Sequence, residues 1–340
     1  MRMVSDMEDY LQEDMSPELR ETVIKLYFDA RRFINTYDLL DEKYIIYTEG
    51  TGGEAMIKMF CVDPSGNLGE RIGMSRSSIF FSATLLPVQY YKDLLSSKPE
   101  ADYEMYVDSP FRSENRLIFT AGDVSSRYTC RNPEQYERIA EYIRKIVRGK
   151  NGNYLVFCPS YAFMDNVFDA FTEKEMSKAG NGLQVFRQES GMDEDARRAF
   201  LENFKEKPHE TILGLCVLGG IFSEGIDLKA DRLIGAIIVG TGLPGIGSER
   251  ELLKVYFDEK RGNGFDYAYL FPGMNKVLQS AGRVIRTQED TGIILLLDER
   301  FAGKDYRNLF PAEWSDRGNC TLNTVEEQLG SFWNRIREKN

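Results

Sequence analysis

The chain has 340 residues, of which 42% are hydrophobic and 29% charged, and its formal net charge is −11. This composition is that of a globular protein with material for about two domains. The negative balance argues against a dedicated nucleic-acid coat, although a local basic groove stays compatible with it. The sequence contains no apolar run long enough to span a bilayer, and its acidic start lacks the apolar core of a signal peptide.

The cysteine and histidine content narrows the chemistry. The cysteines are scattered, odd in number and without C-x-x-C spacing: Cys61, Cys130, Cys158, Cys216 and Cys320. This pattern favours a reducing, cytoplasmic compartment and argues against a disulfide scaffold or a zinc site made by this chain alone. The single histidine, His209, lies in the polar string "KEKPHET". We expect it on the surface, so histidine-based catalysis is not predicted.

The first part of the chain predicts a helix and then two strands. Pro17–Leu40 has helical periodicity, with Ser16 as N-cap and Pro17 in the first turn. The strand-like strings "KYIIYTEG" and "AMIKMFCVD" follow, with a glycine-rich turn between them. They predict a hairpin or a pair of neighbouring strands.

From Ser78 onward, short apolar strings alternate with helical stretches. The expected strands are "SIFFSATL", "RLIFTAG", "NYLVFCPS", "LQVFRQ", "TILGLCVLGG", "RLIGAIIVG", "YAYLF" and "GIILLLDER". The expected helices are Pro133–Arg148, Ala162–Lys178 and Glu194–Lys205, with a helical cap after Asp305. The alternation predicts an α/β fold, a parallel sheet covered on both faces. Ligands of such sheets gather at the carboxyl ends of the strands.

Several of these expected strands end in small or hydroxyl-bearing residues. They are Ser82, Ala83 and Thr84 after one strand, Ser160 and Tyr161 after another, and Ser223, Glu224, Gly225 and Asp227 after a third. Small residues and hydroxyls allow a phosphate chain to approach the backbone closely. For each group taken alone, the pattern favours an ordinary strand-to-helix turn capped by a serine.

The string "QSAGRVIR" places Gln279, Arg283 and Arg286 four and three residues apart. On a helix, this spacing puts the three side chains on one face. Two adjacent guanidiniums need solvent, carboxylates or an anion beside them. Both a solvated helix face and an anion site are compatible with the pattern.

Two further strings have competing interpretations. "ILLLDER" is like a magnesium-binding strand end, but the chain has no G-x-x-x-x-G-K-[ST] phosphate loop, which favours ion pairing of Asp298 and Glu299. "GTGLPGIG", at Gly240–Gly247, is either a plain loop or a nucleotide-sugar loop of an unrelated α/β transferase.

Four strings occur in a fixed order: "SATLLPVQYY", "GNYLVFCPSY", "GGIFSEGIDL" and "PGMNKVLQSAGRVIRTQEDTGIILLLDERF". Together they resemble the C-terminal motor half of superfamily 2 DNA helicases of the XPD/DinG type, over about Ser78 to Trp314. The resemblance implies a RecA-like second motor domain over residues 77–340. Residues 1–76 resemble the end of an arch-like insertion and the closing strands of the first motor domain.

The resemblance also implies a shared ATP site between two RecA-like domains, of which the first holds most of the ATP and the Mg²⁺. By matching positions, Gln279, Arg283 and Arg286 would be catalytic, with an arginine finger among them. Glu224, Gly225, Asp227 and Gly282 would line the ATP, and Ser82, Ala83 and Thr84 would couple hydrolysis to domain movement. Ser160, Tyr161, Arg187 and Ser223 would contact single-stranded DNA.

The departures from the family pattern are a missing phosphate loop, a missing Asp-Glu-Ala-His box and a missing iron–sulfur cysteine cluster. All would lie upstream of Met1, so we interpret the chain as the C-terminal portion of a longer ATP-dependent DNA helicase. Its expected partners are single-stranded DNA and the N-terminal motor domain, and it should be inactive alone and hold no metal. The family implies 5′-to-3′ movement and a repair or replication role. The alternative is a non-catalytic, helicase-derived module that binds nucleic acid or a protein.

Overall fold

The computed structural model describes residues 2–50, 55–175, 182–223, 228 and 230–339. The chain divides into two compact units. Unit 1 comprises Met1–Phe81, Val88–Tyr103 and Gly247–Gly264, and unit 2 comprises Ser82–Pro87, Glu104–Ile246 and Phe265–Asn340. These units are defined by compactness alone. The predicted boundary between residues 76 and 77 comes from the resemblance and not from compactness, so it stays a prediction.

Unit 1 contains a helical start, a hairpin and three further helices. Its elements are α1 (Arg2–Tyr10), α2 (Pro17–Tyr37), β1 (Tyr44–Glu49), β2 (Met56–Cys61), α3 (Ser65–Gly73), α4 (Val88–Leu95) and α8 (Ser248–Arg261). Helix α2 begins as predicted, since the Ser16 hydroxyl accepts the Leu19 N–H at 3.3 Å. Strands β1 and β2 are antiparallel and pair from Tyr44↔Cys61 to Glu49↔Met56, which confirms the predicted hairpin.

A buried carboxylate joins distant segments within unit 1. Asp63 follows β2, and it accepts hydrogen bonds from the Tyr256 hydroxyl (3.0 Å) and the Lys260 ammonium of α8. Asp93 of α4 is also buried and accepts from Arg261 at 2.6 Å. A buried carboxylate needs such partners, because burial without them is costly. These contacts explain why α8 belongs to the same compact unit as the hairpin.

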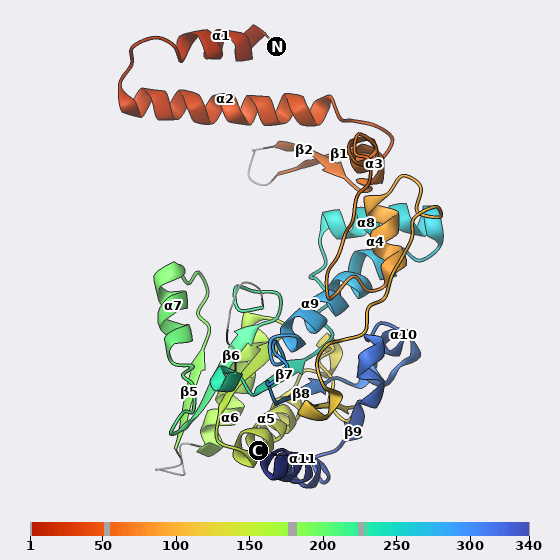
Figure 1. The fold of residues 1–340 in the computed structure, drawn as a ribbon. Helices are drawn as coiled ribbons and strands as arrows, with labels where there is room; N and C mark the ends of the chain where they lie inside the picture. Colours follow the sequence, from red (N-terminus) through yellow and green to blue (C-terminus); the bar gives the residue numbers. More distant parts are fainter. Residues whose placement is uncertain (1, 51–54, 176–181, 224–227, 229, 340) are drawn as a thin grey trace. The chain divides into compact units, whose positions relative to one another are not determined.

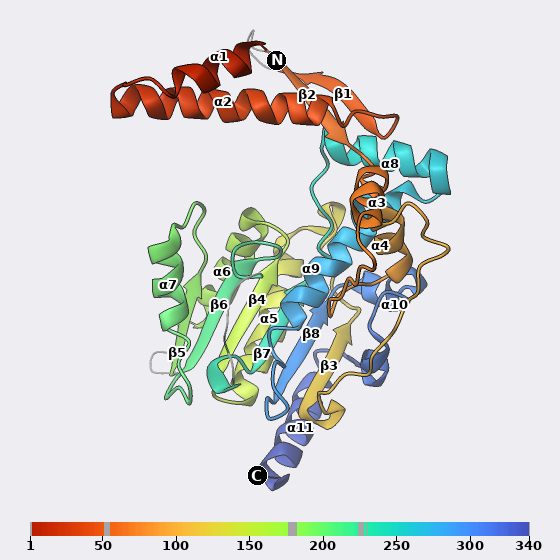
Figure 2. The same cartoon turned by 45° about the horizontal axis from the view of Figure 1, so that its top comes forward.

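Unit 2 is a seven-stranded parallel sheet in the order β5-β6-β4-β7-β8-β3-β9 (Figures 1 and 2). Its strands are β3 (Arg116–Ala121), β4 (Asn153–Cys158), β5 (Leu183–Arg187), β6 (Thr211–Val217), β7 (Gly235–Val239), β8 (Gly292–Leu297) and β9 (Gly318–Cys320). Its helices are α5 (Pro133–Gly149), α6 (Tyr161–Glu175), α7 (Glu194–Glu202), α9 (Phe271–Ala281), α10 (Lys304–Arg307) and α11 (Val325–Lys339).

The sheet is buried on both faces, as predicted for a parallel sheet. Helices α5, α6 and α11 pack in one core cluster with alternate strand residues such as Val156 and Leu295. Helices α7 and α9 pack in the other cluster, with Leu155 and Leu296 among its strand residues. The α/β fold class is therefore confirmed, and α11 confirms a helical cap formed by the tail.

Two predicted strands are wrong. Residues 78–85 form no strand, and Ile79 and Phe81 are 84% and 90% exposed. Strand hydrogen bonds need a neighbouring strand, and no strand in the described part of the chain pairs with this segment. "YAYLF" lies instead in a buried π-helical turn, Asp266–Leu270, that leads into α9. Short apolar runs fit a buried helix as well as a strand.

Packing explains one of the glycines in the loop after β7, Gly242. Gly242 has a φ of +68°, and a Cβ there would lie 2.5 Å from the Gly273 carbonyl oxygen of α9. Gly245, on the same loop, has no atom within 4 Å of its Cβ position. Close approach of the loop to α9 therefore accounts for Gly242 without a nucleotide-sugar ligand.

We expect Gly242→Ala to lower the free energy of unfolding by about 1–3 kcal/mol, because it adds left-handed strain to a backbone clash. Gly245→Ala, the matched control, should change it by less than about 0.5 kcal/mol. Urea denaturation of both variants measures the difference. Equal stabilities would mean that the loop does not need this approach to α9.

Candidate functional site

The four predicted DNA contacts lie at one edge of the sheet. Ser160 and Tyr161 follow β4, Arg187 ends β5, and Ser223 lies in the turn after β6. Strands β5, β6 and β4 are neighbours and parallel, so their carboxyl ends meet at the same edge (Figure 2). The Ser160 hydroxyl accepts the Phe163 N–H at 3.3 Å and caps α6. The structure thus brings these four residues to a common edge.

Gln188, which the sequence patterns did not single out, connects two of these strand ends. It directly follows β5, is 3% exposed, and its side chain bonds both the Tyr161 hydroxyl (2.8 Å) and the Val217 N–H (3.0 Å). A lone glutamine after a strand carries no motif. The sequence around it gives no signal either, because the flanking strand already contains the polar residues Gln184 and Arg187.

Arg187 already has partners on α6. Its guanidinium forms an ion pair with Asp165 at 3.0 Å and lies over the Phe168 ring, 4.9 Å from its centroid. Both charged side chains are about half exposed, so the pair contributes little to stability. A phosphate bound by Arg187 has to compete with Asp165.

Arg283 reaches the exit of β6. Its Nε and Nη2 atoms donate to the Ser223 carbonyl oxygen at 3.1 and 2.6 Å. The Ser223 hydroxyl in turn accepts from the Gly219 N–H (2.8 Å) and from the Ser280 hydroxyl of α9 (3.2 Å). Both serines are buried. These bonds tie the end of α9 to the turn that precedes Glu224.

The predicted shared helical face of Gln279, Arg283 and Arg286 is wrong. Helix α9 ends at Ala281, and Gly282 is its C-cap, whose N–H donates to the Leu278 carbonyl. Of the three side chains only Gln279 lies on the helix. Glycine is a poor helix former, and the chain turns there before Arg283. Gly282 is exposed, which fits a role in ending the helix.

Arg286 lies in a turn that Asp290 organises. One carboxylate oxygen of Asp290 accepts the N–H groups of Arg286 and Thr287, both at 2.7 Å, and the other accepts the Ala230 N–H at 3.2 Å. Asp290 is buried. The carboxylate therefore fixes the backbone of Arg286 independently of its side chain. Arg286 follows α9 in the sequence without being part of the helix, and it is partly exposed.

The remaining residues singled out in the sequence are the predicted coupling residues, three predicted ATP contacts and the histidine. Ser82, Ala83 and Thr84 lie in a turn of unit 2, where the Ser82 hydroxyl accepts the Thr84 N–H at 3.2 Å. Glu224, Gly225 and Asp227 lie outside the described residues. His209 is exposed, as predicted.

Asp298 is engaged in an ion pair at the end of β8, as the ion-pairing interpretation predicted. Its carboxylate is fully buried, accepts from Arg300 Nε at 2.7 Å, and accepts from the Ser126 hydroxyl at 2.7 Å. Glu299 accepts from the Ser125 hydroxyl and forms an ion pair with Arg127. The protein's own donors thus occupy these two carboxylates, which leaves them poorly suited to a magnesium ion.

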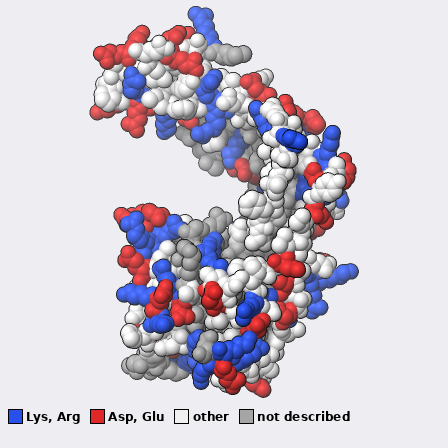
Figure 3. Space-filling model, viewed as in Figure 1, with Lys and Arg blue, Asp and Glu red and all other residues white. Residues whose placement is uncertain are grey.

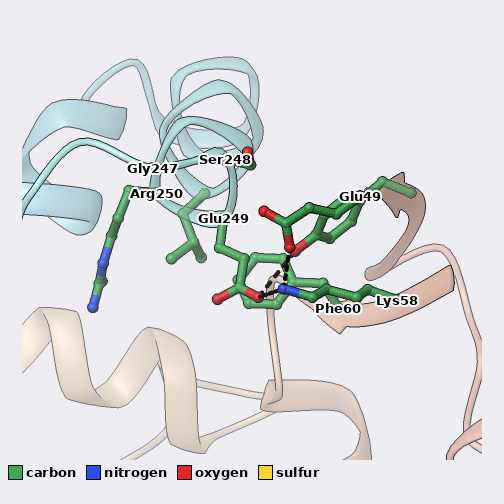
Figure 4. Close-up of a pocket in the computed structure, with 9 residues that line it drawn as sticks. Glu49, Lys58, Phe60, Gly247, Ser248, Glu249 and Arg250 are labelled. Atoms are coloured by element: carbon green, nitrogen blue, oxygen red, sulfur yellow. Dashed lines mark hydrogen bonds and ion pairs between the residues drawn. The ribbon is translucent and has the colours of Figure 1, made fainter. Parts of the chain in front are cut away.

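A pocket of about 360 Å³ lies within unit 1, between the hairpin and the start of α8 (Figure 4). Lys58 points into it and forms ion pairs with Glu49 and Glu249, and the Tyr47 hydroxyl donates to Glu249 at 3.0 Å. The charges that line the pocket compensate one another. None of the predicted site residues lines it.

Figure 3 shows basic and acidic side chains interleaved over unit 2 in this view, without a continuous basic face. Among the described residues, no group of three or more His, Cys, Asp or Glu side chains could hold a metal ion. No described helix is both long enough and apolar enough to cross a membrane.

Comparison with known proteins gives one family match. The family model "Helicase C-terminal domain" matches residues 143–317. A probable ATP-dependent helicase of Methanocaldococcus jannaschii is 26% identical over an alignment of 276 residues that covers 77% of this chain and 40% of that protein. The ATP-dependent DNA helicase CHL1 of Debaryomyces hansenii is 23% identical, over 96% of this chain and 43% of that protein.

The chain thus spans about 40% of the length of these curated relatives. A solved structure of XPD without ligand is similar with a TM-score of 0.57 at 21% identity, covering 90% of this chain and 63% of that chain. An XPD helicase structure gives a TM-score of 0.56 at 21% identity, over 94% of this chain and 61% of that chain. These likenesses confirm the predicted RecA-like fold.

Proposed function

The chain belongs to the helicase C-terminal domain family, and from that premise we propose that it acts as the second motor domain of an ATP-dependent DNA helicase. The similar proteins named above are helicases, two of them described as ATP-dependent. We extend that activity to a protein in which this chain is combined with an N-terminal motor domain. Such a protein would work inside the cell.

One observation carries the proposal, the attachment of Arg283 to the exit of β6. This attachment holds the Arg283 guanidinium against the backbone of the turn that follows β6. Arg286 follows in a turn that Asp290 fixes. In the proposal, the γ-phosphate of ATP approaches these two arginines from the partner domain, and Arg283 and Arg286 stabilise the charge that develops on it.

The other predicted site residues have proposed roles at the same ATP site. Gln279 would orient the attacking water or the phosphate, and Glu224, Gly225, Asp227 and Gly282 would lie against the nucleotide. Ser82, Ala83 and Thr84 would transmit hydrolysis to domain movement. The described residues offer no cluster of metal ligands, so no catalytic step is assigned to a metal held by this chain. The Mg²⁺ that accompanies ATP would be held by the partner domain.

The apolar segment before Ser82 supports the proposal that a partner domain packs against this chain. Ile79, Phe80 and Phe81 have the composition of a buried strand and yet are exposed. Exposed apolar runs of this kind mark surfaces that another element covers. In the proposal, they add a strand to the sheet of the N-terminal motor domain, and hydrolysis then requires both domains.

We expect the purified chain alone to show no Mg²⁺-dependent ATP hydrolysis above the buffer background. The reason is that the phosphate loop and the magnesium carboxylates would belong to the partner domain. A coupled assay of ADP release, with and without single-stranded DNA, measures this. Robust turnover by the chain alone would contradict the two-domain site.

The alternative, a non-catalytic interaction module, is favoured by the absence of a G-x-x-x-x-G-K-[ST] string from the 340 residues. The DNA upstream of the first codon distinguishes the two functions. An open frame that encodes a phosphate loop and a cysteine cluster supports the helicase. A stop codon directly before Met1 supports the module.

A further inference from the structure

The orientation of the Gln188 side chain follows from its partners. The Val217 N–H can only donate, so the atom facing it at 3.0 Å is the Gln188 oxygen Oε1. The amide nitrogen Nε2 therefore faces the Tyr161 hydroxyl oxygen, at 2.8 Å, and donates to it. The Gln188 N–H donates to the Leu215 carbonyl at 2.8 Å. The glutamine is thus fixed at both its backbone and its side chain.

This orientation determines what the Tyr161 hydroxyl can do. The phenol oxygen already accepts from Gln188, so its own proton points away from the glutamine. Among the residues that the structure describes, no acceptor takes that proton. Tyr161 is half-buried and packs against the core cluster of α5, α6 and α11. Its ring is therefore partly used for packing, whereas its hydroxyl is an available donor.

The surrounding charges allow an anion to approach. Asp165 lies one helical turn after Tyr161 on α6, where an uncompensated carboxylate would repel a phosphate. Its carboxylate is paired with Arg187 at 3.0 Å, which compensates the charge. The Tyr161 hydroxyl thus lies beside a neutralised pair, at the edge where β4, β5 and β6 end.

We propose that Gln188 is a positioning residue, which presents the Tyr161 hydroxyl as a hydrogen-bond donor to a phosphodiester oxygen of a bound single strand. The proposal rests on the proposed function and deepens it. Recognition at this edge is through the sugar-phosphate backbone and not through stacking of a base on Tyr161. It is consequently independent of base identity.

Binding of a fluorescein-labelled oligothymidylate to the chain, followed by fluorescence anisotropy at low salt, tests the donor role. Tyr161→Phe keeps the ring and removes the hydroxyl, so its Kd should rise about ten-fold, as for loss of a hydrogen bond to a charged group. Tyr128→Phe, which removes an exposed hydroxyl elsewhere in unit 2, should leave the Kd within about two-fold of wild type. If Tyr161 were a stacking platform, Tyr161→Phe would bind as wild type does.

Gln188→Glu tests the positioning role with little change of shape. A carboxylate only accepts, so it would take both the Val217 N–H and the Tyr161 proton and turn that proton inward. We expect the same rise in Kd as for Tyr161→Phe, and no further rise in the double variant, because both changes act through one hydroxyl. Additive effects would mean that the new charge simply repels the strand, and would overturn the positioning role. Circular dichroism of each variant checks folding.

An abasic strand, with the deoxyribose-phosphate chain but no bases, separates backbone recognition from stacking. The ratio of Kd values between Tyr161→Phe and wild type should be the same for this strand as for oligothymidylate. If wild type binds both strands and Tyr161→Phe binds equally well, only the present assignment fails. If wild type binds neither strand, the proposed function fails and the assignment with it.

Discussion

Replacing Arg286 by alanine, in a protein that carries both motor domains, should lower the rate of ATP hydrolysis by about three orders of magnitude. An arginine that reaches the γ-phosphate is worth on the order of 10³–10⁵ in rate, because its planar guanidinium offers paired donors to the charge that develops there. The turn should survive the substitution, since Asp290 holds the backbone N–H of Arg286 and not its side chain. Steady-state hydrolysis in the presence of single-stranded DNA measures the effect.

Two controls separate this role from general damage. Arg286→Lys keeps the charge but loses the paired donors, so it should recover only part of the rate. Arg198→Ala removes an exposed arginine of α7 that pairs weakly with Asp195, and it should hydrolyse ATP normally. Nucleotide binding by Arg286→Ala should partly survive. Near-normal turnover by that variant would remove Arg286 from the catalytic machinery.

The second large effect concerns stability. Asp298→Ala should lower the free energy of unfolding by about 3–5 kcal/mol, because breaking a buried ion pair leaves an uncompensated charge. The carboxylate is 0% exposed and bonds Arg300 and both the N–H and the hydroxyl of Ser126. Urea denaturation at neutral pH measures the change. Asp195→Ala, which removes an exposed i,i+3 pair on α7, is the control and should cost less than about 1 kcal/mol.

The same pair predicts a pH dependence. Burial alone would raise the pKa of Asp298, but the hydrogen bonds and charge of Arg300, with the Ser126 hydroxyl, outweigh it and hold the pKa below the ordinary value of 3.8. A depressed folded-state pKa contributes stability that is complete above the unfolded-state value and is lost as the pH falls through the folded-state value. The stability difference between wild type and Asp298→Ala should therefore be constant at neutral pH and shrink in strong acid. A difference unchanged throughout the acid range would mean that the ionised carboxylate is not the stabilising form.

The sequence predicts the sheet well because its strands are buried on both faces. Strands such as Asn153–Cys158 and Gly292–Leu297 are mostly apolar runs between helical stretches, and they form β4 and β8 as expected. The same reasoning fails for residues 78–85 and for "YAYLF". An apolar run indicates that a segment tends to be buried. It does not show whether a neighbouring strand is present to pair with the segment, or whether the buried segment is a helix.

The site was predictable in part for a similar reason. Parallel topology alone brings Tyr161, Arg187 and Ser223 to one edge once their strands are neighbours. The prediction that Arg283 and Arg286 share a helical face was wrong. Side chains three or four residues apart lie on one face only while the helix continues, and Gly282 ends this helix. Gln188 and Asp290 were missed because their importance lies in tertiary hydrogen bonds, which leave no spacing in the sequence.

The most direct test compares binding of ADP with binding of ADP, aluminium fluoride and Mg²⁺, a mimic of the transferring phosphoryl group, in the protein with both motor domains. An arginine that acts in the transition state should favour the mimic over ADP by about 100-fold or more. We predict that Arg286→Ala retains most of its affinity for ADP and loses most of its preference for the mimic. If Arg286→Ala binds the mimic as tightly as wild type does, Arg286 does not serve a nucleotide held by a partner domain.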